Sequence, residues 1–350
     1  MAKRSRDLLT AWSALKITGL FLGFCVAAAC LSPLVGAVHV SGADLWRAIS
    51  AGGADRADVG VQIILYQRVP RILLGLICGG GLALAGGVFQ ALLRNPLATP
   101  YTLGVSGGAA LGAVVAISFG IFSFHLGPVH SVQLLALMGS VVNIGIVYLL
   151  ARARGHFSTA ALLLCGVTLG LISSALILFV RYLSHPNELV MLDRWMMGSL
   201  DIVGYQDILS LLPFLVPGVI LLLASASNYN QLAFGEEMAA GRGVDVPRIQ
   251  KVSFFAGSMV TSAVVSVCGP IGFVGLIVPH IVRRLVGPDH RLLLPCSVLA
   301  GGGFLVLCDT LSRTVIAPSE LPVGIITAML GGPFFLWLLV SGPIDGSARR

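Results

Sequence analysis

The chain has 350 residues, of which 56% are hydrophobic and only 11% are charged, and its formal net charge is +7. A soluble domain of average composition carries roughly 25% charged residues, so this chain has too little polar surface for a water-soluble fold. Its basic residues are spread along the chain and no basic helix or tail collects them. This pattern favours short basic loops at one membrane face and argues against nucleic acid as a partner.

Apolar runs recur that are long enough to cross a hydrocarbon core of about 30 Å as helices. Residues 211–224 and 321–340 show none of the alternation that a β-barrel strand requires, and backbone groups in lipid must pair within their own segment. We therefore predict an all-α membrane protein that forms a single polytopic transmembrane domain over residues 1–350. About ten spans are expected, at residues 13–35, 71–93, 103–123, 131–151, 158–183, 207–226, 252–270, 272–287, 293–315 and 323–341.

The first of these spans also resembles a signal peptide, because Lys3-Arg4-Ser5-Arg6 precedes an apolar run that contains Ala27-Ala28-Ala29-Cys30. The residue three positions before Cys30 is alanine and everything downstream is also membrane-embedded, so we expect an uncleaved span. All seven cysteines lie in apolar segments without a Cys-x-x-Cys pair, which indicates packing residues rather than disulfides or metal ligands.

The orientation follows from the basic residues, which are enriched in cytoplasmic loops. With the N-terminus inside, 15 of the 22 lysines and arginines lie on the cytoplasmic side and seven lie outside. This predicts cytoplasmic N- and C-termini, a periplasmic loop at residues 184–206 and a cytoplasmic segment at residues 227–251. The outer arginines, which include Arg68, Arg71 and Arg313, are an excess that the enrichment of basic residues in cytoplasmic loops does not predict. Their presence needs a functional explanation.

The chemistry of an enzyme is not visible in the sequence. There is no phosphate-binding loop, no His-Glu-x-x-His zinc motif and no cofactor motif, and the one Gly-x-Ser-x-Gly match at residues 104–108 opens a membrane span instead of following a strand. Asp309 is the main acidic residue within a span, and Arg313 lies one helical turn further on, where the two side chains can pair. Two interpretations remain open: Asp309 and Arg313 neutralise each other, or Asp309 is the proton-carrying acid of a secondary carrier.

Four segments carry a more specific pattern. They are Arg68-Val69-Pro70-Arg71 continuing to Arg94-Asn95-Pro96-Leu97-Ala98 and Leu103-Gly104-Val105-Ser106-Gly107; Trp195-Met196-Met197-Gly198-Ser199-Leu200; Gly235-Glu236-Glu237-Met238-Ala239-Ala240-Gly241-Arg242-Gly243-Val244; and Gly269-Pro270-Ile271-Gly272-Phe273 continuing through Pro279-His280, Asp309 and Glu320-Leu321-Pro322 to Gly331-Gly332-Pro333. Together, and in this order, they resemble the permease family of bacterial ABC importers for iron chelates, haem and cobalamin.

The resemblance implies a type II ABC importer permease fold with ten transmembrane helices in the bacterial inner membrane. It also implies a homodimer, two ATPase subunits on the cytoplasmic face and a periplasmic substrate-binding protein. ATP hydrolysis then belongs to a partner, which agrees with the missing phosphate-binding loop, and we expect a transport subunit without cofactor or bound metal. A proton-coupled secondary carrier is the second functional hypothesis, and a membrane enzyme is the third.

The resemblance also implies roles for particular residues. Arg68, Arg71 and Arg313 would receive acidic residues of the binding protein, for which guanidinium groups are well suited. The coupling contact with the ATPase would come from residues in segment 227–251, namely Glu236, Glu237, Ala239, Gly241, Arg242 and Gly243. Glu236 and Glu237 would begin a helix, where negative charge is favourable.

The substrate pathway is expected to include Arg181, Met196 and Met197. A cation there suits the propionates of haem or the carboxylates of a ferric siderophore, so we rank these chelates ahead of cobalamin. An alternative is that Arg181 pairs within the chain, with Glu188 or Asp193.

Overall fold

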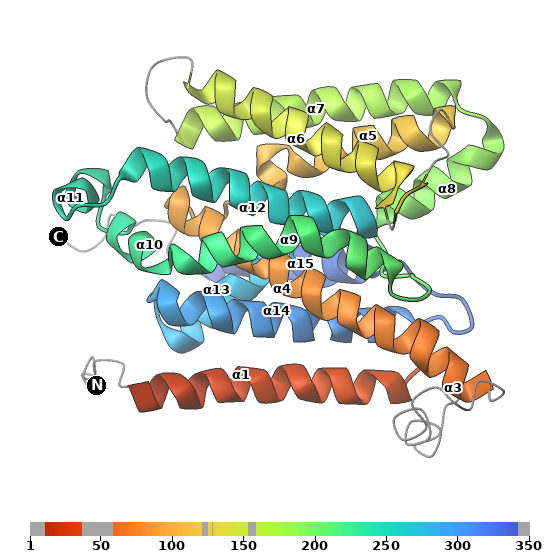
Figure 1. The fold of residues 1–350 in the computed structure, drawn as a ribbon, viewed down its shortest axis with the longest axis horizontal. Coiled ribbons are helices and arrows are strands. Elements are labelled where there is room, and N and C mark those ends of the chain that lie inside the picture. Colours follow the sequence, from red (N-terminus) through yellow and green to blue (C-terminus); the bar gives the residue numbers. More distant parts are fainter. Residues whose placement is uncertain (1–10, 37–58, 121–124, 128, 153–158, 342–350) are drawn as a thin grey trace.

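The computed structural model describes residues 11–36, 59–120, 125–127, 129–152 and 159–341, and within them the chain is almost entirely helical (Figure 1). Arg47, Arg56, Arg154 and both terminal basic clusters, which entered the orientation prediction, lie outside these residues. A short hairpin is formed by β1 (His125–Leu126) and β2 (Val129–His130). The helices are α1 (Ala11–Leu31), η1 (Ser32–Leu34), α3 (Val59–Ile63), η2 (Ile64–Arg68), α4 (Val69–Leu92), η3 (Tyr101–Leu103), α5 (Val105–Phe119), α6 (Ser131–Arg152), α7 (Thr159–Leu183), α8 (Pro186–Met197), α9 (Gln206–Ala224), α10 (Ala226–Leu232), α11 (Glu236–Gly241), α12 (Val246–Cys268), α13 (Val274–Val286), α14 (His290–Ser312) and α15 (Val323–Ser341).

The long helices have the length and composition of membrane spans. In the described part of the chain, seven helical segments qualify, and α5 and α15 provide two shorter apolar helices. Each of the ten predicted spans also contains a helix. The prediction of an α-helical membrane protein is confirmed, whereas the number of ten crossings remains a prediction.

The core of the bundle is built around α4, which packs against α12, α13 and α14. Glycines make this close packing possible. A Cβ atom at Gly79 of α4 would overlap the carbonyl oxygen of Gly301 in α14, and one at Gly275 of α13 would lie 2.7 Å from the carbonyl oxygen of Leu82. The backbones of α4, α13 and α14 therefore meet directly, with no room for larger side chains between them.

The predicted break at Gly269-Pro270 is confirmed, because α12 ends at Cys268 and α13 begins only at Val274. The 13 residues of α13 extend about 20 Å, less than the ~30 Å hydrocarbon core, so the break lies inside the bundle. Backbone groups there need internal partners. The hydroxyl of Tyr101 donates to the carbonyl oxygen of Ile271 at 2.6 Å and accepts from its amide nitrogen at 2.9 Å.

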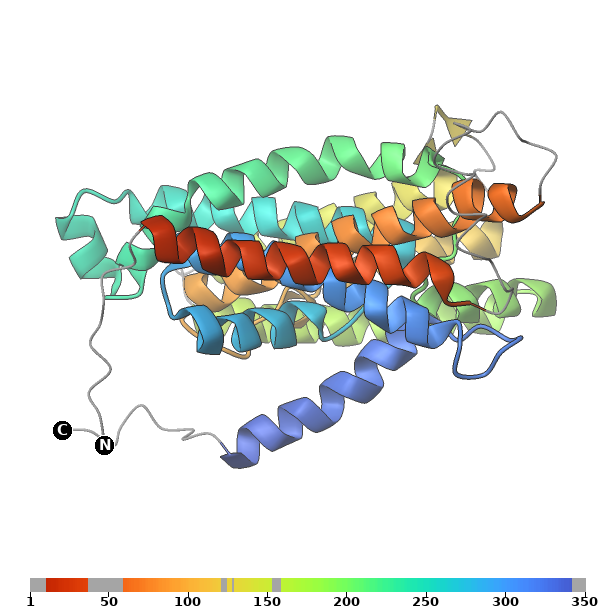
Figure 2. The same cartoon turned by 90° about the horizontal axis from the view of Figure 1, so that it is seen from below.

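Polar elements gather at the two ends of the bundle. Figures 1 and 2 show α10 and α11 at one end, where α1 begins and α15 ends, and α3, α8 and the β hairpin at the other. We call these the α11 end and the α8 end. Figure 2 also shows α15 running obliquely away from the other helices, which leaves Met329, Leu336 and Trp337 exposed.

Two helix boundaries differ from the prediction for local reasons. The span expected to start at residue 71 follows helical turns that begin at Val59, because a π-helical turn at η2 joins α3 to α4 just before Pro70. Such a turn accommodates a proline that lacks the N–H of a regular helix. The helix expected to start at residue 252 begins at Val246, where the side chain of Asp245 accepts a hydrogen bond from the backbone of Arg248.

The predicted loop 184–206 contains the amphipathic helix α8, which the hydropathy pattern missed because of its polar residues. A capping box starts it: the backbone N–H of His185 donates to Glu188 at 3.0 Å, and Pro186 occupies the first turn.

Candidate functional site

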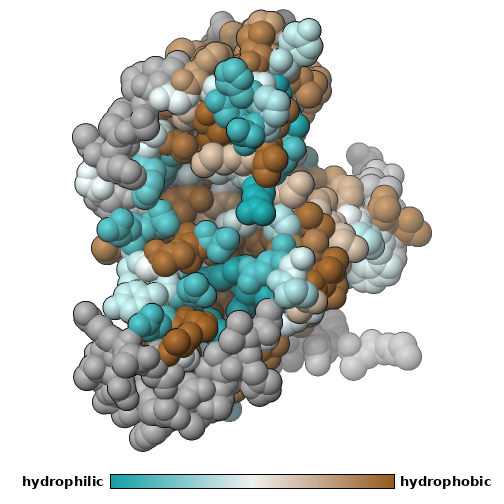
Figure 3. All heavy atoms as spheres, turned by 90° about the vertical axis from the view of Figure 1, so that its right-hand side faces the viewer, coloured by the Kyte–Doolittle hydropathy of each residue, from teal (hydrophilic) through white to brown (hydrophobic). Residues whose placement is uncertain are grey.

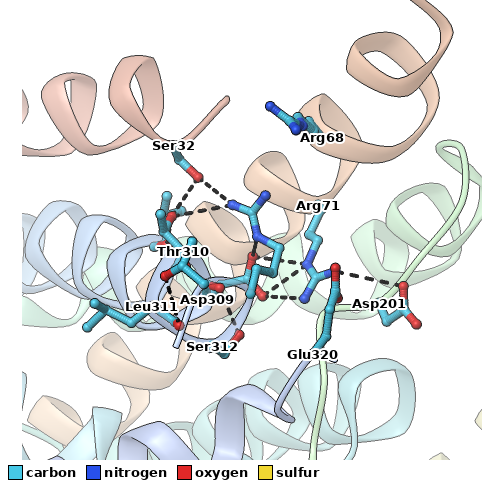
Figure 4. Close-up of polar contacts among 12 residues, drawn as sticks. Ser32, Arg68, Arg71, Asp201, Asp309, Thr310, Leu311, Ser312 and Glu320 are labelled. Atoms are coloured by element: carbon cyan, nitrogen blue, oxygen red, sulfur yellow. Dashed lines mark hydrogen bonds and ion pairs between the residues drawn. The ribbon is translucent and has the colours of Figure 1, made fainter. Parts of the chain in front are cut away.

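The α8 end carries a buried ionic cluster formed by Arg71, Asp309, Arg313 and Glu320, which we call the arginine cluster (Figure 4). Asp309 lies at its centre. Its carboxylate accepts hydrogen bonds from Nε of Arg71 at 3.0 Å, and it forms ion pairs with Nη2 of Arg71 at 2.9 Å and with Nε of Arg313 at 3.1 Å. Nη1 of Arg71 donates to Glu320 at 2.7 Å. The expected pairing of Asp309 with Arg313 is confirmed, and Arg71 is an additional partner that the sequence did not reveal.

Three helix ends bring the cluster together. Arg71 lies in the first turn of α4, Asp309 in the last turn of α14 and Arg313 directly after it. Nη2 of Arg313 also donates to the hydroxyl of Ser32 at 2.9 Å, which ties the end of α1 to the end of α14. The helix termini at this end are thus joined by charged hydrogen bonds, which are stronger than neutral ones.

Arg68 lies beside this cluster, since its guanidinium and that of Arg313 are both next to Gly36. Its side chain is buried and donates from Nη1 to the carbonyl oxygen of Pro33, and Figure 4 shows it on the opposite side of Arg71 from Glu320. All three predicted docking arginines are therefore at the α8 end, and all are at most 8% exposed in the single chain. Glu320 is the accessible member of the arginine cluster, since its side chain is 43% exposed.

A cavity of about 560 Å³ opens beside the cluster. Arg71, Arg194, Met197, Asp201 and Glu320 line it, and Figure 3 shows hydrophilic side chains gathered across this face of the molecule. Asp201 is largely exposed and lies 3.8 Å from Arg71. Cationic, acidic and thioether groups thus share one opening at the α8 end.

Arg181 has a partner within the chain. At the end of α7 it pairs with Asp193 of α8, and its guanidinium lies 3.8 Å from the sulfur of Met196. Of the two alternatives left open for an internal pairing, Asp193 is the one present, while Glu188 is used in the cap of α8. Met197 belongs to the 560 Å³ cavity, but Arg181 and Met196 do not line it.

The predicted coupling residues lie together at the α11 end. Glu236 begins α11 and is 3.6 Å from Arg94 and 3.1 Å from the side-chain nitrogen of Gln250. Arg242 donates to Gln231 at 2.8 Å and stacks 5.1 Å above the ring of Phe234. Arg94 thus joins the end of α4 to the start of α11.

Within this segment Ala239 is fully buried and anchors α11 to the bundle. Glu237, Gly241, Arg242 and Gly243 are exposed, as are the large apolar side chains of Met238 and Phe234. Gly243 has a φ of +85°, a conformation that glycine adopts at little cost and that turns the chain towards α12. The segment is therefore a short, well-anchored projection with a mixed polar and apolar surface.

Next to this projection, Asp289 caps α14. Burial raises its pKa, but hydrogen bonds from Asn230 and from the backbone and side chain of Arg291 outweigh burial, so the pKa of Asp289 lies below its usual value. Asn230 of α10 also accepts from the backbone N–H of His290 at 2.8 Å. The charged cap thus holds α10 against the start of α14.

Residues 24–341 match the FecCD transport family. The chain belongs to this family. It is 44% identical over 305 residues to the cobalamin import system permease protein BtuC of Halobacterium salinarum, covering 86% of this chain and 80% of that protein. It is 37% identical over 325 residues to the hemin transport system permease protein HmuU of Yersinia pestis, covering 92% and 94% of the two chains.

Among solved structures, the chain is similar to a metal-chelate type ABC transporter in an inward-facing conformation, with a TM-score of 0.79 and 31% identity. The similarity covers 94% of this chain and all of that one. The fold is thus that of a type II ABC importer permease, and the chain is a transport component of the ABC class.

Proposed function

We propose that this permease is the membrane subunit of an ATP-driven importer that moves a metal chelate from the periplasm to the cytoplasm. The observation that carries the proposal is the family match over residues 24–341, together with two polar sites at opposite ends of one bundle. Alternating access needs a site for substrate delivery at one end and a site for the energy source at the other.

The α11 end is the cytoplasmic end in this proposal. The helix ends that carry Arg94, Arg152, Arg248 and Lys251 are found there, as the excess of basic residues in cytoplasmic loops requires. α11 with its flanking residues is then the segment that contacts the ATPase subunits. Its exposed Met238 and Phe234 supply an apolar contact area, and Glu237 and Arg242 supply charges that orient the ATPase on this surface.

The coupling role is tested by mutating that surface. Arg242→Glu and Met238→Asp should reduce co-purification of the ATPase subunits. Ala240→Ser, a conservative change at an exposed residue of the same helix, should not. Retention of the ATPase by both variants at wild-type levels would remove the coupling segment from the proposal.

At the opposite end we propose that the arginine cluster and Arg68 dock the binding protein. In the single chain Arg71 is already held by Asp309 and covered by Glu320, so an incoming carboxylate has to replace Glu320. Glu320 suits such an exchange, because its side chain is part-exposed, whereas Asp309 is only 2% exposed and stays in place.

This docking scheme makes Glu320 a competitor of the partner. Glu320→Gln should strengthen docking, and Arg71→Glu should weaken it, most visibly at low ionic strength where exposed charges are least screened. Binding of the loaded binding protein to the permease in nanodiscs would be measured at two salt concentrations. Equal affinities for Glu320→Gln and the wild type would argue against the exchange.

For the substrate we propose haem or a ferric siderophore, with cobalamin as a second candidate. The 37% identity to a hemin permease over 92% of this chain supports the first candidate, and the 44% identity to a cobalamin permease over 86% of this chain supports the second. Arg181 adds little to this choice, because its pairing with Asp193 partly neutralises its charge. The two-fold assembly of two permease chains, with α7 and α15 exposing apolar faces, is also part of the proposal.

The deciding experiment measures ATPase activity of the permease–ATPase complex in lipid, with the binding protein loaded with haem, a ferric siderophore or cobalamin. Selective stimulation by one loaded form would support the importer and name its substrate. Transport that persists without the ATPase and collapses with the proton gradient would instead favour a secondary carrier.

A further inference from the structure

A long apolar groove lies on the side of the bundle between α6 and α9, with α12 as its floor. Its volume is about 700 Å³, and its walls include Val141 of α6, Phe214 and Pro217 of α9, and Phe255 and Met259 of α12. Figure 1 shows α12 between the other two helices along this side. The groove takes no part in either of the two polar sites at the ends of the bundle.

The shape of the groove follows from α9. Pro213 and Pro217 lie inside this helix, where proline bends the helix axis. Gly218 brings α9 onto α12, since a Cβ atom there would lie 2.6 Å from a methyl group of Val260. The contact closes the floor between α9 and α12, and the groove opens to the side between α6 and α9.

One end of the groove is cationic. Arg248 and Lys251, in the first turns of α12, line it at the α11 end. Both side chains are exposed, and neither forms an ion pair with any residue that the structure describes. Glu236, Glu237 and Asp245 line an adjacent hollow that Arg248 and Lys251 also border, but none of these acidic residues lines the groove itself.

The length of the groove matches one leaflet of a bilayer. From Arg248 to Met259 the helix rises about 16 Å at 1.5 Å per residue. Half of a hydrocarbon core of about 30 Å is about 15 Å. The two cations therefore lie where the headgroups of one leaflet begin, and the apolar walls extend to about the middle of the bilayer.

We propose that this groove binds a phospholipid with an anionic headgroup, with one acyl chain between α6 and α9 and the phosphate between Arg248 and Lys251. An acyl chain needs no hydrogen-bond partners, which suits walls of aliphatic, aromatic and proline side chains. Basic pockets between membrane helices on the cytoplasmic side are suited to anionic headgroups. The lipid would brace α6 against α9 at the point where these helices do not contact each other.

The test measures lipid association directly and needs no transport. The purified permease chain is reconstituted in phosphatidylcholine liposomes with spin-labelled phosphatidylglycerol or spin-labelled phosphatidylcholine, and the immobilised fraction of each probe is quantified. The wild type should prefer phosphatidylglycerol, and the double variant R248Q/K251Q should lose most of that preference, with each lost basic residue lowering it by up to about five-fold at roughly 1 kcal/mol per residue. Arg291→Gln is the matched control, since this exposed arginine at the same end does not line the groove.

A second variant separates the groove from the charges. Val141→Trp fills the groove from its exposed rim and keeps both cations, so it should lower the number of immobilised phosphatidylglycerol molecules. The proposal is overturned if the wild type shows no preference for the anionic probe. It is equally overturned if R248Q/K251Q keeps the preference of the Arg291→Gln control, or if Val141→Trp immobilises as much phosphatidylglycerol as the wild type.

Discussion

Replacing Asp309 by asparagine removes the negative charge at the centre of the arginine cluster and leaves two buried guanidinium groups facing each other. Asp309 is 2% exposed, and Arg71 and Arg313 are 8% and 4% exposed, so solvent screens their charges weakly. Removing one partner of a buried ion pair typically costs 3–5 kcal/mol, because the remaining charge is left uncompensated.

The contacts that remain around the two arginines place the expected loss of stability within this range. Asparagine keeps one acceptor oxygen, and Arg71 retains Glu320 at 2.7 Å, so its charge is still partly balanced. Among the residues that the structure describes, the hydrogen bonds left to Arg313 are those with the neutral hydroxyl of Ser32 at 2.9 Å and with Thr310 at 3.4 Å. We therefore expect Asp309→Asn to lower the free energy of unfolding by about 3 kcal/mol, the lower end of the range.

Reversible unfolding in mixed micelles of a mild detergent and SDS gives the measurement. Glu320→Gln is the control, because it removes a charge from the same cluster at a part-exposed position and should cost about 1 kcal/mol or less. A cycle with Arg71→Gln then isolates the pair, and the double variant with Asp309→Asn should cost less than the sum of the single changes. If Asp309→Asn lowers the free energy of unfolding no more than Glu320→Gln does, the burial of Asp309 adds nothing to the strength of its ion pairs.

Three further changes test other parts of the structure by the same unfolding measurement. Gly79→Val forces a side chain into the backbone of α14 and should cost about 1–3 kcal/mol or prevent folding, whereas Gly145→Val, whose Cβ atom meets nothing within 4 Å, should be near neutral. Tyr101→Phe strands the amide and carbonyl groups of Ile271 inside the bundle and should cost about 1–3 kcal/mol, and an unchanged stability would mean that water takes over both bonds. Asp289→Asn keeps a capping side chain but removes its charge at the start of α14, and should destabilise by about 0.3–1 kcal/mol near neutral pH. Because the folded pKa of Asp289 lies below the usual 3.8, the difference from wild type should vanish as the pH falls through that lowered pKa, and a difference that grows on acidification would contradict the assigned sign.

The positions of the helices were predictable because lipid imposes a simple rule on the sequence. Every predicted span contains a helix, and the break at Gly269-Pro270 was visible as a glycine and a proline together. The missed helix α8 does not cross the bundle, and its start depends on a capping interaction between His185 and Glu188 that hydropathy does not register. The sequence thus identified the elements that the membrane requires and overlooked one that only local hydrogen bonding requires.

The ionic contacts were predictable only where they are local. Arg313 lies four residues after Asp309, so one helical turn was enough to pair them. The contact of Arg71 with the same carboxylate joins residues 238 positions apart. No periodicity in one sequence reveals such a pair, and Arg68, Arg71 and Arg313 were recognised as unusual only because they oppose the charge rule in the predicted orientation. Their burial, and the covering of Arg71 by Glu320, required the arrangement of α4 and α14 in space.

The two proposed sites are joined through a single helix. Arg71 lies in the first turn of α4, and Arg94, two residues after its end, contacts Glu236 at the start of α11. Along its length α4 meets α13 and α14 backbone to backbone at glycines, so it cannot slide past them without overlap. These three helices are therefore expected to move as one rigid unit. The movement that opens a path is then expected at α7 and α15, whose large apolar side chains are exposed in the single chain and belong to the two-fold assembly in the proposal.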